Sequence, residues 1–326
     1  MSCDTTGNKV DVKEGRGEGS LGANGGVGWG RKIRFNSGVL GDYDVVVKGG
    51  VIQFCTSPVL KTTVWENGVI SNSAVSNVVL HSDSKITDSI VRSSYVMSHT
   101  SIIDAALILS SILGPDSHYG SGETHCSLLG PNTVAHHQSL CISHISPGGR
   151  TNLGYGANAG SNHTGRLPDA EFWNGEGVFI GLAAVVKFSC DLSRSYYTLV
   201  AAGTVVNSGV VVTAPFSLVT SNGNGDTEVR PGWVVYSSPY TIARAVGKFK
   251  NRSKAAGHKW YSKRNVLRAG IMEGCRREIE GAGGGRGAKV VKREKGVKAY
   301  EDLCKVRERE WREMTHTHSY ITHHQP

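Results

Sequence analysis

The sequence predicts a mainly β protein built as a parallel β-helix, a solenoid of short strands. Apolar residues recur at intervals of six, at Ile90, Val96, Ile102 and Ile108, and the residue after each is also apolar. Small residues stand four positions after the first three of these, at Ser94, Thr100 and Ala106. A period of six fits neither a helix nor a simple alternating strand, but a short strand followed by a tight turn produces it. The 42 glycines, with many valines and serines, suit such a chain.

The repeat extends on both sides of this stretch. The same step occurs at Val69 and Val75, and it resumes at Leu128, Val134 and Leu140. Three such hexads per coil would build a triangular prism that takes one large and one small inward residue on each face. Later apolar runs, ending with GWVVYS at 232–237, are expected to be strands of the last coils. A β-sandwich is the second choice, because it would need longer alternating strands.

We expect four segments along the chain. Residues 1–35, rich in glycine and charge, should be disordered or linker-like. Residues 36–240 should form the β-helix, with loop insertions near 114–126 and 166–179. Residues 241–315 should form a basic α-helical extension, and 316–326 a histidine-rich disordered tail.

The net charge of +9 comes from the C-terminal segment. Residues 241–326 contain 21 Lys and Arg against 9 Asp and Glu, whereas residues 1–240 contain 15 against 18. We expect these helices to pack on the end of the solenoid with their charges in solvent. Basic residues alternate with Phe249, Trp260 and Tyr261, but the absence of a recognised reader motif makes a nucleic-acid partner unlikely.

The sequence also suggests a compartment. No apolar run is long enough to span a membrane, and no charged and then apolar leader begins the chain. The seven cysteines form no CxxC pair and no regular framework, which fits reduced thiols better than disulfides. We therefore expect a cytoplasmic protein without a membrane span.

Two polar elements identify a resemblance. They are GPNTVAHH, from Gly130 to His137, and GSNHTGR, from Gly160 to Arg166. With the hexads, over about residues 64–240, they make the chain similar to the left-handed β-helix, or hexapeptide-repeat, superfamily. That superfamily includes acyltransferases and the β-helical domains of nucleotide-sugar pyrophosphorylases. The resemblance implies a left-handed coil, a homotrimer, and a ligand cleft between subunits in which an imidazole accepts a proton.

His136 and His137 are the candidate catalytic residues, because neutral imidazole suits proton transfer near pH 7. On an extended rung, adjacent residues face opposite sides, so one of the two should point inward and the other outward. Gln138 beside them is a candidate substrate contact. In the alternative interpretation, one histidine forms a hydrogen bond inside the coil and the other lies at a subunit interface.

Asn162, His163 and Arg166 are candidate substrate-binding residues. Flanking glycines permit close backbone approach, and the arginine could clamp a phosphate or carboxylate with two hydrogen bonds. Nearby acids, such as Glu176, could pair with Arg166 instead. The alternative is a tight loop whose polar side chains satisfy the backbone between two coils.

Two functions remain open from the sequence. The first is a transferase or binding protein for an anionic small molecule, with acyl-CoA, a nucleotide sugar or a sugar phosphate as the substrate class. The second is a non-catalytic β-helix that serves as an oligomerisation or sensing scaffold. No cofactor is identified, and no metal site is predicted, because no spacing of histidine and cysteine matches a standard zinc signature.

Overall fold

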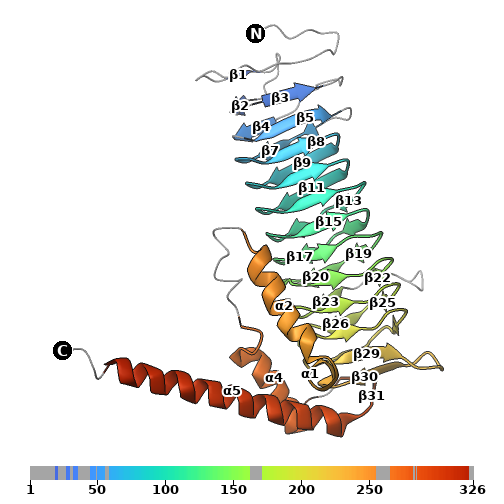
Figure 1. The fold of residues 1–326 in the computed structure, drawn as a ribbon. Coiled ribbons are helices and arrows are strands. Elements are labelled where there is room, and N and C mark those ends of the chain that lie inside the picture. Colours follow the sequence, from blue (N-terminus) through green and yellow to red (C-terminus); the bar gives the residue numbers. More distant parts are fainter. Residues whose placement is uncertain are drawn as a thin grey trace.

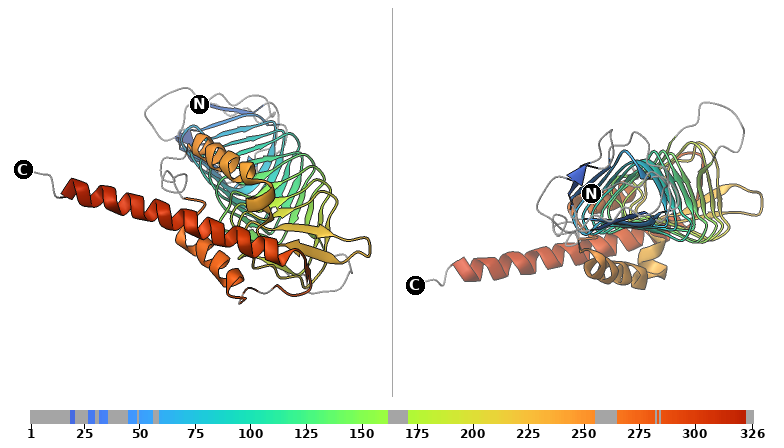
Figure 2. Two further views of the ribbon diagram at one scale, coloured as in Figure 1. Left: turned by 60° about the horizontal axis from the view of Figure 1, so that its bottom comes forward. Right: turned by 90° about the horizontal axis from the view of Figure 1, so that it is seen from above.

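The computed structural model describes residues 19–20, 27–29, 32–35, 45–48, 50–55, 59–161, 171–254, 265–281, 283 and 285–322. The chain forms a parallel β-solenoid followed by C-terminal helices, as predicted. The coils stack from the N-terminal end toward the helices (Figure 1). Viewed from above, they superpose into one closed outline, and the last helix reaches past it (Figure 2). The left-handed sense of the coil stays a prediction from the resemblance.

Each coil contributes to three faces in turn. The first face contains β3 (Lys32–Phe35), β5 (Val51–Cys55), β8 (Val69–Ser71), β10 (Lys85–Thr87), β12 (Ser101–Ile103), β15 (His118–Gly120), β18 (Val134–Ala135), β21 (Asn152–Leu153), β24 (Phe179–Ile180), β27 (Leu199–Val200) and β29 (Leu218–Ser221). The second contains β6 (Val59–Leu60), the first halves of β9 (Ala74–Leu80) and β11 (Ile90–Val96), β13 (Leu107–Leu109), β16 (Glu123–His125), β19 (Leu140–Ile142), β22 (Asn158–Ser161), β25 (Val185–Lys187) and β28 (Val205–Val206). The third contains β2 (Val27–Trp29), β4 (Val45–Lys48), β7 (Thr62–Val64), the second halves of β9 and β11, β14 (Ile112–Leu113), β17 (Leu128–Leu129), β20 (His144–Ser146), β23 (Phe172–Asn174) and β26 (Cys190–Leu192).

The coils between Val69 and Val134 are shorter than three full hexads. Partners on the first face are 16, 16, 17, 16 and 18 positions apart along Val69, Lys85, Ser101, His118, Val134 and Asn152. Inward residues therefore follow one another at intervals of five or six positions. Val91 is one of these inward residues and is fully buried, whereas Ile90 before it is 40% exposed. The length of the turn sets the interval: the turn before Ile108 holds two residues with positive φ, Asp104 and Ala105, and the next turn holds one, Ser110. A strict period of six was wrong for this reason.

The small residues of the repeat lie inside the coil. Ser94, Thr100 and Ala106 are all buried. The Ser94 hydroxyl accepts a hydrogen bond from the Ser111 backbone N–H in the next coil, at 3.1 Å. Ser111 does the same for the N–H of Ser127, at 3.2 Å. These stacked hydroxyls satisfy backbone donors that would otherwise be buried without a partner.

Two segments predicted as irregular contain strands. Residues 114–126 do not form a projecting loop, because β15 and β16 lie there and pair in parallel with strands of both neighbouring coils. Within residues 1–35, β2, β3 and the short β1 (Gly19–Ser20), which pairs antiparallel with β2, are described. The rest of 1–35 lies outside the described residues. Of 166–179, the part up to 170 also lies outside them, and β23 follows at Phe172.

The corners of the solenoid at Gly114 and Gly130, each followed by a proline, explain why the GPNTVAHH element begins with glycine. A Cβ atom on Gly130 would lie 2.3 Å from the Pro147 carbonyl oxygen and 2.7 Å from the Gly149 nitrogen. One on Gly114 would lie 2.4 Å from the Gly130 carbonyl carbon. Backbone from neighbouring coils therefore fills the side-chain space at this corner, and only glycine fits.

Antiparallel segments end the solenoid. β30 (Thr227–Arg230) folds back antiparallel on β29, and β31 (Lys289–Val290) pairs in parallel with β30. On the third face, Val211 pairs with Arg286 in an antiparallel bridge. The predicted strand GWVVYS is instead the short helix α1 (Trp233–Ser237), which follows Gly232 with φ of 63°.

The basic extension is helical, as predicted, and packs on the last coils. It contains α2 (Pro239–Arg252), α4 (Ala269–Ile279) and α5 (Arg293–Thr322). A second apolar core holds them there, made by Tyr197, Phe216, Val234, Phe249, Val266, Ile271, Cys275 and Tyr300. α5 continues through 316–322, which were predicted to be a disordered tail, and residues 323–326 lie outside the described part. No helix within the described residues is long and apolar enough to cross a bilayer.

We predict that Gly130→Ala lowers the free energy of unfolding by about 1–3 kcal/mol, because the added methyl group must displace backbone of the next coil. The matched control is Gly223→Ala in the β29–β30 turn, where a Cβ would have no neighbour within 4 Å. We expect that control to change stability by less than about 0.5 kcal/mol. Urea denaturation of both variants checks this, and equal stability would show that the corner tolerates a side chain.

Candidate functional site

Helix α2 lies along one corner of the solenoid, beside the first face (Figure 1). At its C-terminal end, Asn132 Nδ2 donates to Ser253 Oγ at 3.1 Å, and the backbone N–H of Lys254 donates to Asp116 Oδ1 at 2.8 Å. One coil further along, the guanidinium of Arg150 stacks over the Phe249 ring, 4.7 Å from its centroid. The helix is therefore fixed against several successive coils.

A groove of about 290 Å³ runs between α2 and the first face. We call it the α2 groove; its lining residues are Arg150, Asn152, Gly177, Phe179, Tyr197, Leu199, Val234, Thr241, Ile242, Arg244, Ala245, Lys248 and Phe249. Three of these are cationic, most of the others are apolar, and none is acidic. The Oδ1 atom of Asn152 is buried there and has no hydrogen-bond partner among the described residues. The α2 groove therefore combines an apolar floor with positive charge.

The positive charges of the groove lie close together. Burial, and then the charges of Arg252 and Arg244, lower the pKa of the Lys248 ammonium. Arg244, Lys248 and Arg252 are four residues apart, which places them on one side of α2. Like charges at this spacing repel one another, so an anion bound among them would relieve that repulsion.

A buried carboxylate holds Arg150 in place. Glu176 Oε1 accepts from Arg150 Nη1 at 3.0 Å, and its Oε2 accepts from Arg268 Nη2 at 2.6 Å. The Tyr197 hydroxyl donates to Glu176 Oε1 at 2.5 Å and accepts from Arg150 Nη1 at 2.8 Å. Burial and the Glu176 charge raise the pKa of Tyr197, which stays a neutral donor. Glu176, 1% exposed, thus joins two coils to the C-terminal extension.

In this network the Glu176 carboxylate binds Arg150 and Arg268. Arg166, the partner suggested by the sequence, lies outside the described residues. The guanidinium of Arg268 also lies over the Tyr196 ring, 5.7 Å from its centroid. Two arginines against one carboxylate leave a net positive charge at the wall of the α2 groove.

The two candidate catalytic histidines lie at a turn, not on an extended rung. β18 ends at Ala135, and both His137 and Gln138 have positive φ, of 57° and 59°. His136 is half-buried, and His137 and Gln138 are exposed. The expected alternation, with one histidine inside the coil, was wrong, because the strand stops before the pair begins.

His136 belongs to a group of three imidazoles. Its ring lies 3.9 Å from that of His137 and 5.9 Å from that of His118, centroid to centroid. His118 Nδ1 and Ser101 Oγ share a hydrogen bond of 2.6 Å. Burial, then His137, His118, Lys248 and Arg252, lower the pKa of His136. Burial and neighbouring charges also lower the pKa of His118. Both rings are therefore neutral near pH 7, and Lys248 connects His136 electrostatically to the α2 groove.

Another histidine of the same segment has a structural role. His144 is fully buried, and its Nε2–H donates to Asn174 Oδ1. Burial lowers the pKa of His144 to about 4, so the ring is neutral inside the solenoid. It packs on Phe172, with 4.6 Å between ring centroids. The histidines near 130–166 therefore do not form one cluster.

Asn162, His163 and Arg166 lie outside the described residues. In sequence they lie between β22, which ends at Ser161 on the second face, and β23, which begins at Phe172 on the third. His136, His137 and Gln138 follow a first-face strand. The two predicted parts of the site thus follow strands of different faces.

Sequence reasoning missed Arg150, Arg244 and Lys248 as candidate ligand contacts. A signal for the last two existed, because basic residues recur every four positions on the predicted helix. Arg150 stands within the polar segment 130–166 but was passed over in favour of its histidines. Among the residues that the structure describes, no group of three metal-ligating side chains converges.

Comparison with known proteins gives one relative. No protein-family model matches the chain. It is 30% identical over 129 residues to a protein of Treponema pallidum (strain Nichols) described only as an uncharacterized protein. That match covers 39% of this chain and 17% of the relative, so the chain spans less than a fifth of the relative's length.

We predict that Glu176→Gln lowers the free energy of unfolding by about 3–5 kcal/mol, because it leaves two arginines near a buried site without their carboxylate. Chemical denaturation at neutral pH measures the loss. Glu273→Gln is the matched control, since Glu273 meets Arg277 at 3.5 Å on the exposed side of α4. We expect that control to cost less than about 1 kcal/mol. Equal losses would contradict the structural importance of the Glu176 network.

Proposed function

We propose that this protein is a hexapeptide-repeat β-solenoid that binds an anionic small molecule in the α2 groove. The observation that carries the proposal is the placement of Arg150, Arg244 and Lys248 around an apolar cleft without an acidic lining residue. A phosphate or carboxylate between these side chains would form charge-assisted hydrogen bonds. The proposed ligand classes are nucleotide sugars, sugar phosphates and acyl donors.

The groove also suits the rest of such a molecule. Phe179 and Leu199 of the first face oppose Phe249 of α2 and would cover an apolar or aromatic portion. Asn152 offers a buried amide oxygen to a ligand donor. A ligand with an anionic group and a less polar body therefore matches the groove better than a simple inorganic anion.

A transferase activity is the catalytic form of this proposal. His136 is neutral near pH 7, half-buried and electrostatically connected to Lys248, and it would accept the proton of an attacking hydroxyl or amine. Asn162, His163 and Arg166, which follow a second-face strand, stay proposed as further substrate contacts. Without catalysis, the same groove would make the protein a sensing scaffold.

We further propose a homotrimer assembled through the third face. On this face, the outward-facing residues that pair with one another across six successive coils form an apolar column: Val79, Tyr95, Ile112, Leu128, Ile145 and Trp173. Tyr95, Ile112 and Trp173 are 38%, 49% and 42% exposed. Contiguous apolar surface of this kind marks interaction sites, and a rotation axis along the solenoid would bring equivalent columns together.

The cellular location is also a proposal. Within the described residues, Cys126, Cys141, Cys190 and Cys275 are free thiols. Such thiols are stable in a reducing compartment, which supports a cytoplasmic protein.

We predict that Lys248→Gln and Arg244→Gln each weaken ligand binding about tenfold or more, since each removes a charged hydrogen-bond donor from the groove. Titration calorimetry with a nucleotide sugar, a sugar phosphate and an acyl-CoA measures this. Arg276→Gln, an exposed arginine of α4, is the matched control and should leave binding unchanged. If none of the three ligand classes binds the unaltered chain, the proposal fails.

A transferase would show a separate effect at the imidazole. His136→Asn should abolish transfer to an acceptor while the ligand affinity stays within about twofold. Unchanged turnover in this variant would exclude His136 as the base and favour the scaffold.

We predict that Ile112→Lys converts the trimer to a monomer, because it places a charge in the middle of the apolar column. Size-exclusion chromatography with light scattering measures the mass. Leu182→Lys is the matched control: Leu182 is 51% exposed but lies at the turn after β24, away from the third face. A monomeric unaltered chain, or a trimeric Ile112→Lys variant, would contradict this assembly.

A further inference from the structure

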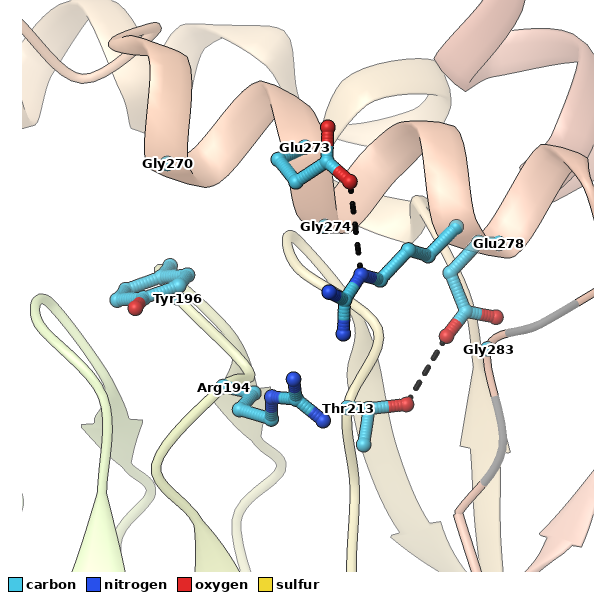
Figure 3. Close-up of a pocket in the computed structure, with 9 residues that line it drawn as sticks. Arg194, Tyr196, Thr213, Gly270, Glu273, Gly274, Glu278 and Gly283 are labelled. Carbon is cyan, nitrogen blue, oxygen red and sulfur yellow. Dashed lines mark hydrogen bonds and ion pairs between the residues drawn. The ribbon is translucent and has the colours of Figure 1, made fainter.

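A second cavity lies between α4 and the last coils of the solenoid. It has a volume of about 250 Å³, and its charged and polar lining consists of Arg194, Tyr196, Thr213, Glu273, Arg277 and Glu278. Figure 3 shows the Arg194 side chain on the solenoid side of this space, and the Glu273 and Glu278 side chains on the α4 side. The cavity shares no lining residue with the α2 groove.

Glu278 places a buried carboxylate at one side of the cavity. It is 6% exposed, and its Oε1 accepts a hydrogen bond from the Thr213 hydroxyl at 3.0 Å (Figure 3). Arg293 donates to the backbone carbonyl of Glu278 at 3.5 Å, not to the carboxylate. Within the described part of the chain, this carboxylate forms no ion pair. A buried carboxylate without a cationic partner is costly, so a cation supplied by a ligand would stabilise it.

Backbone covers the same carboxylate on another side. A Cβ atom at Gly283 would lie 2.0 Å from a carboxyl atom of Glu278. The backbone at Gly283 therefore lies close to this carboxyl group. Both Glu278 and Gly283 line the cavity (Figure 3).

Arg194 supplies a cation at the other side. It follows β26 in the next turn, is exposed, and forms no hydrogen bond or ion pair within the described residues. Its guanidinium projects into the cavity in Figure 3. Arg277 also lines the cavity, but its Nε meets Glu273 Oε1 at 3.5 Å at the rim. Within the described residues, Arg194 and Glu278 thus face the same space, and neither side chain forms an ion pair.

Two glycines leave part of the α4 wall of the cavity without side chains. Gly270 and Gly274 lie one turn apart on α4 and both line the cavity. A Cβ atom at Gly270 would have no neighbour within 4 Å, whereas one at Gly274 would lie 2.8 Å from Pro215 Cγ. A larger residue at Gly270 would therefore occupy the cavity without striking the protein.

We propose that this cavity binds a small zwitterion, an α-amino acid, with its ammonium group on Glu278 and its carboxylate on Arg194. The lining carries two arginines and two glutamates, so a ligand without net charge is electrostatically matched. A cavity of about 250 Å³ accommodates a compact molecule such as an amino acid. Bound there, an amino acid would connect α4 to the last coils and stabilise the docked extension.

The test is a thermal-shift screen of the full chain against each standard L-amino acid at millimolar concentration, followed by calorimetry. At least one amino acid should raise the melting temperature. Its analogue without the amino group and its analogue without the carboxylate should each bind at least about tenfold more weakly. If no amino acid binds, or if either analogue binds as well as the parent, the proposal is overturned.

Four variants locate the site. Arg194→Gln and Glu278→Gln should each reduce affinity about tenfold or more. Gly270→Phe should abolish binding by filling the cavity, and Gly270→Ala, which adds only a methyl group, should retain it. If Glu278→Gln does not fold, Arg194→Gln and the two Gly270 variants test the site instead. These variants should fold, because Arg194 is exposed and a Cβ atom at Gly270 has no neighbour within 4 Å. Unchanged binding in Gly270→Phe would overturn the assignment.

Discussion

Register between coils is the constraint on which the whole structure depends. Parallel pairing fixes each coil directly over the last one, so the inward side chains of each coil must pack against those of the next. The coil that has the large ring of Tyr119 on its first face has Thr124 on its second face, and the next coil has Ala135 and Cys141 at these two positions. Where the interior becomes polar, His144 Nε2 and Asn174 Oδ1 form a hydrogen bond with each other. The outward residues have no such restriction, and this freedom allows one face to be apolar while another carries histidines.

The C-terminal extension is joined to this stack by charge as much as by apolar packing. Glu176 lies in a coil, but its two arginine partners come from the preceding coil and from the segment before α4. Because Arg150 also lines the α2 groove and stacks on Phe249, the groove wall and the docking of the helices depend on the same carboxylate. A change that moves α2 or α4 would therefore change the electrostatics of the groove.

The repeat was predictable from sequence because each strand carries its own local signal. The turns were less predictable: residues 114–126 contain Tyr119 and Thr124 in place of aliphatic residues, so a regular coil there resembled a loop. GWVVYS has β-branched residues, but Gly232 turns the chain and Val234 packs into the second core, so tertiary contacts decide for a helix. The candidate site depends on residues far apart in sequence, such as Arg268 and Glu176, 92 positions apart, which no local pattern connects.

The folded-back end of the solenoid has a consequence for self-association. An open parallel edge exposes a row of backbone donors and acceptors that can template the next strand, including one from another molecule. Here β30 and β31 cover the edge of the first face, and Arg286 pairs across Val211 on the third. The stack is thereby terminated at this end, and filament growth by end-to-end addition of further copies is blocked while lateral association of the faces stays open.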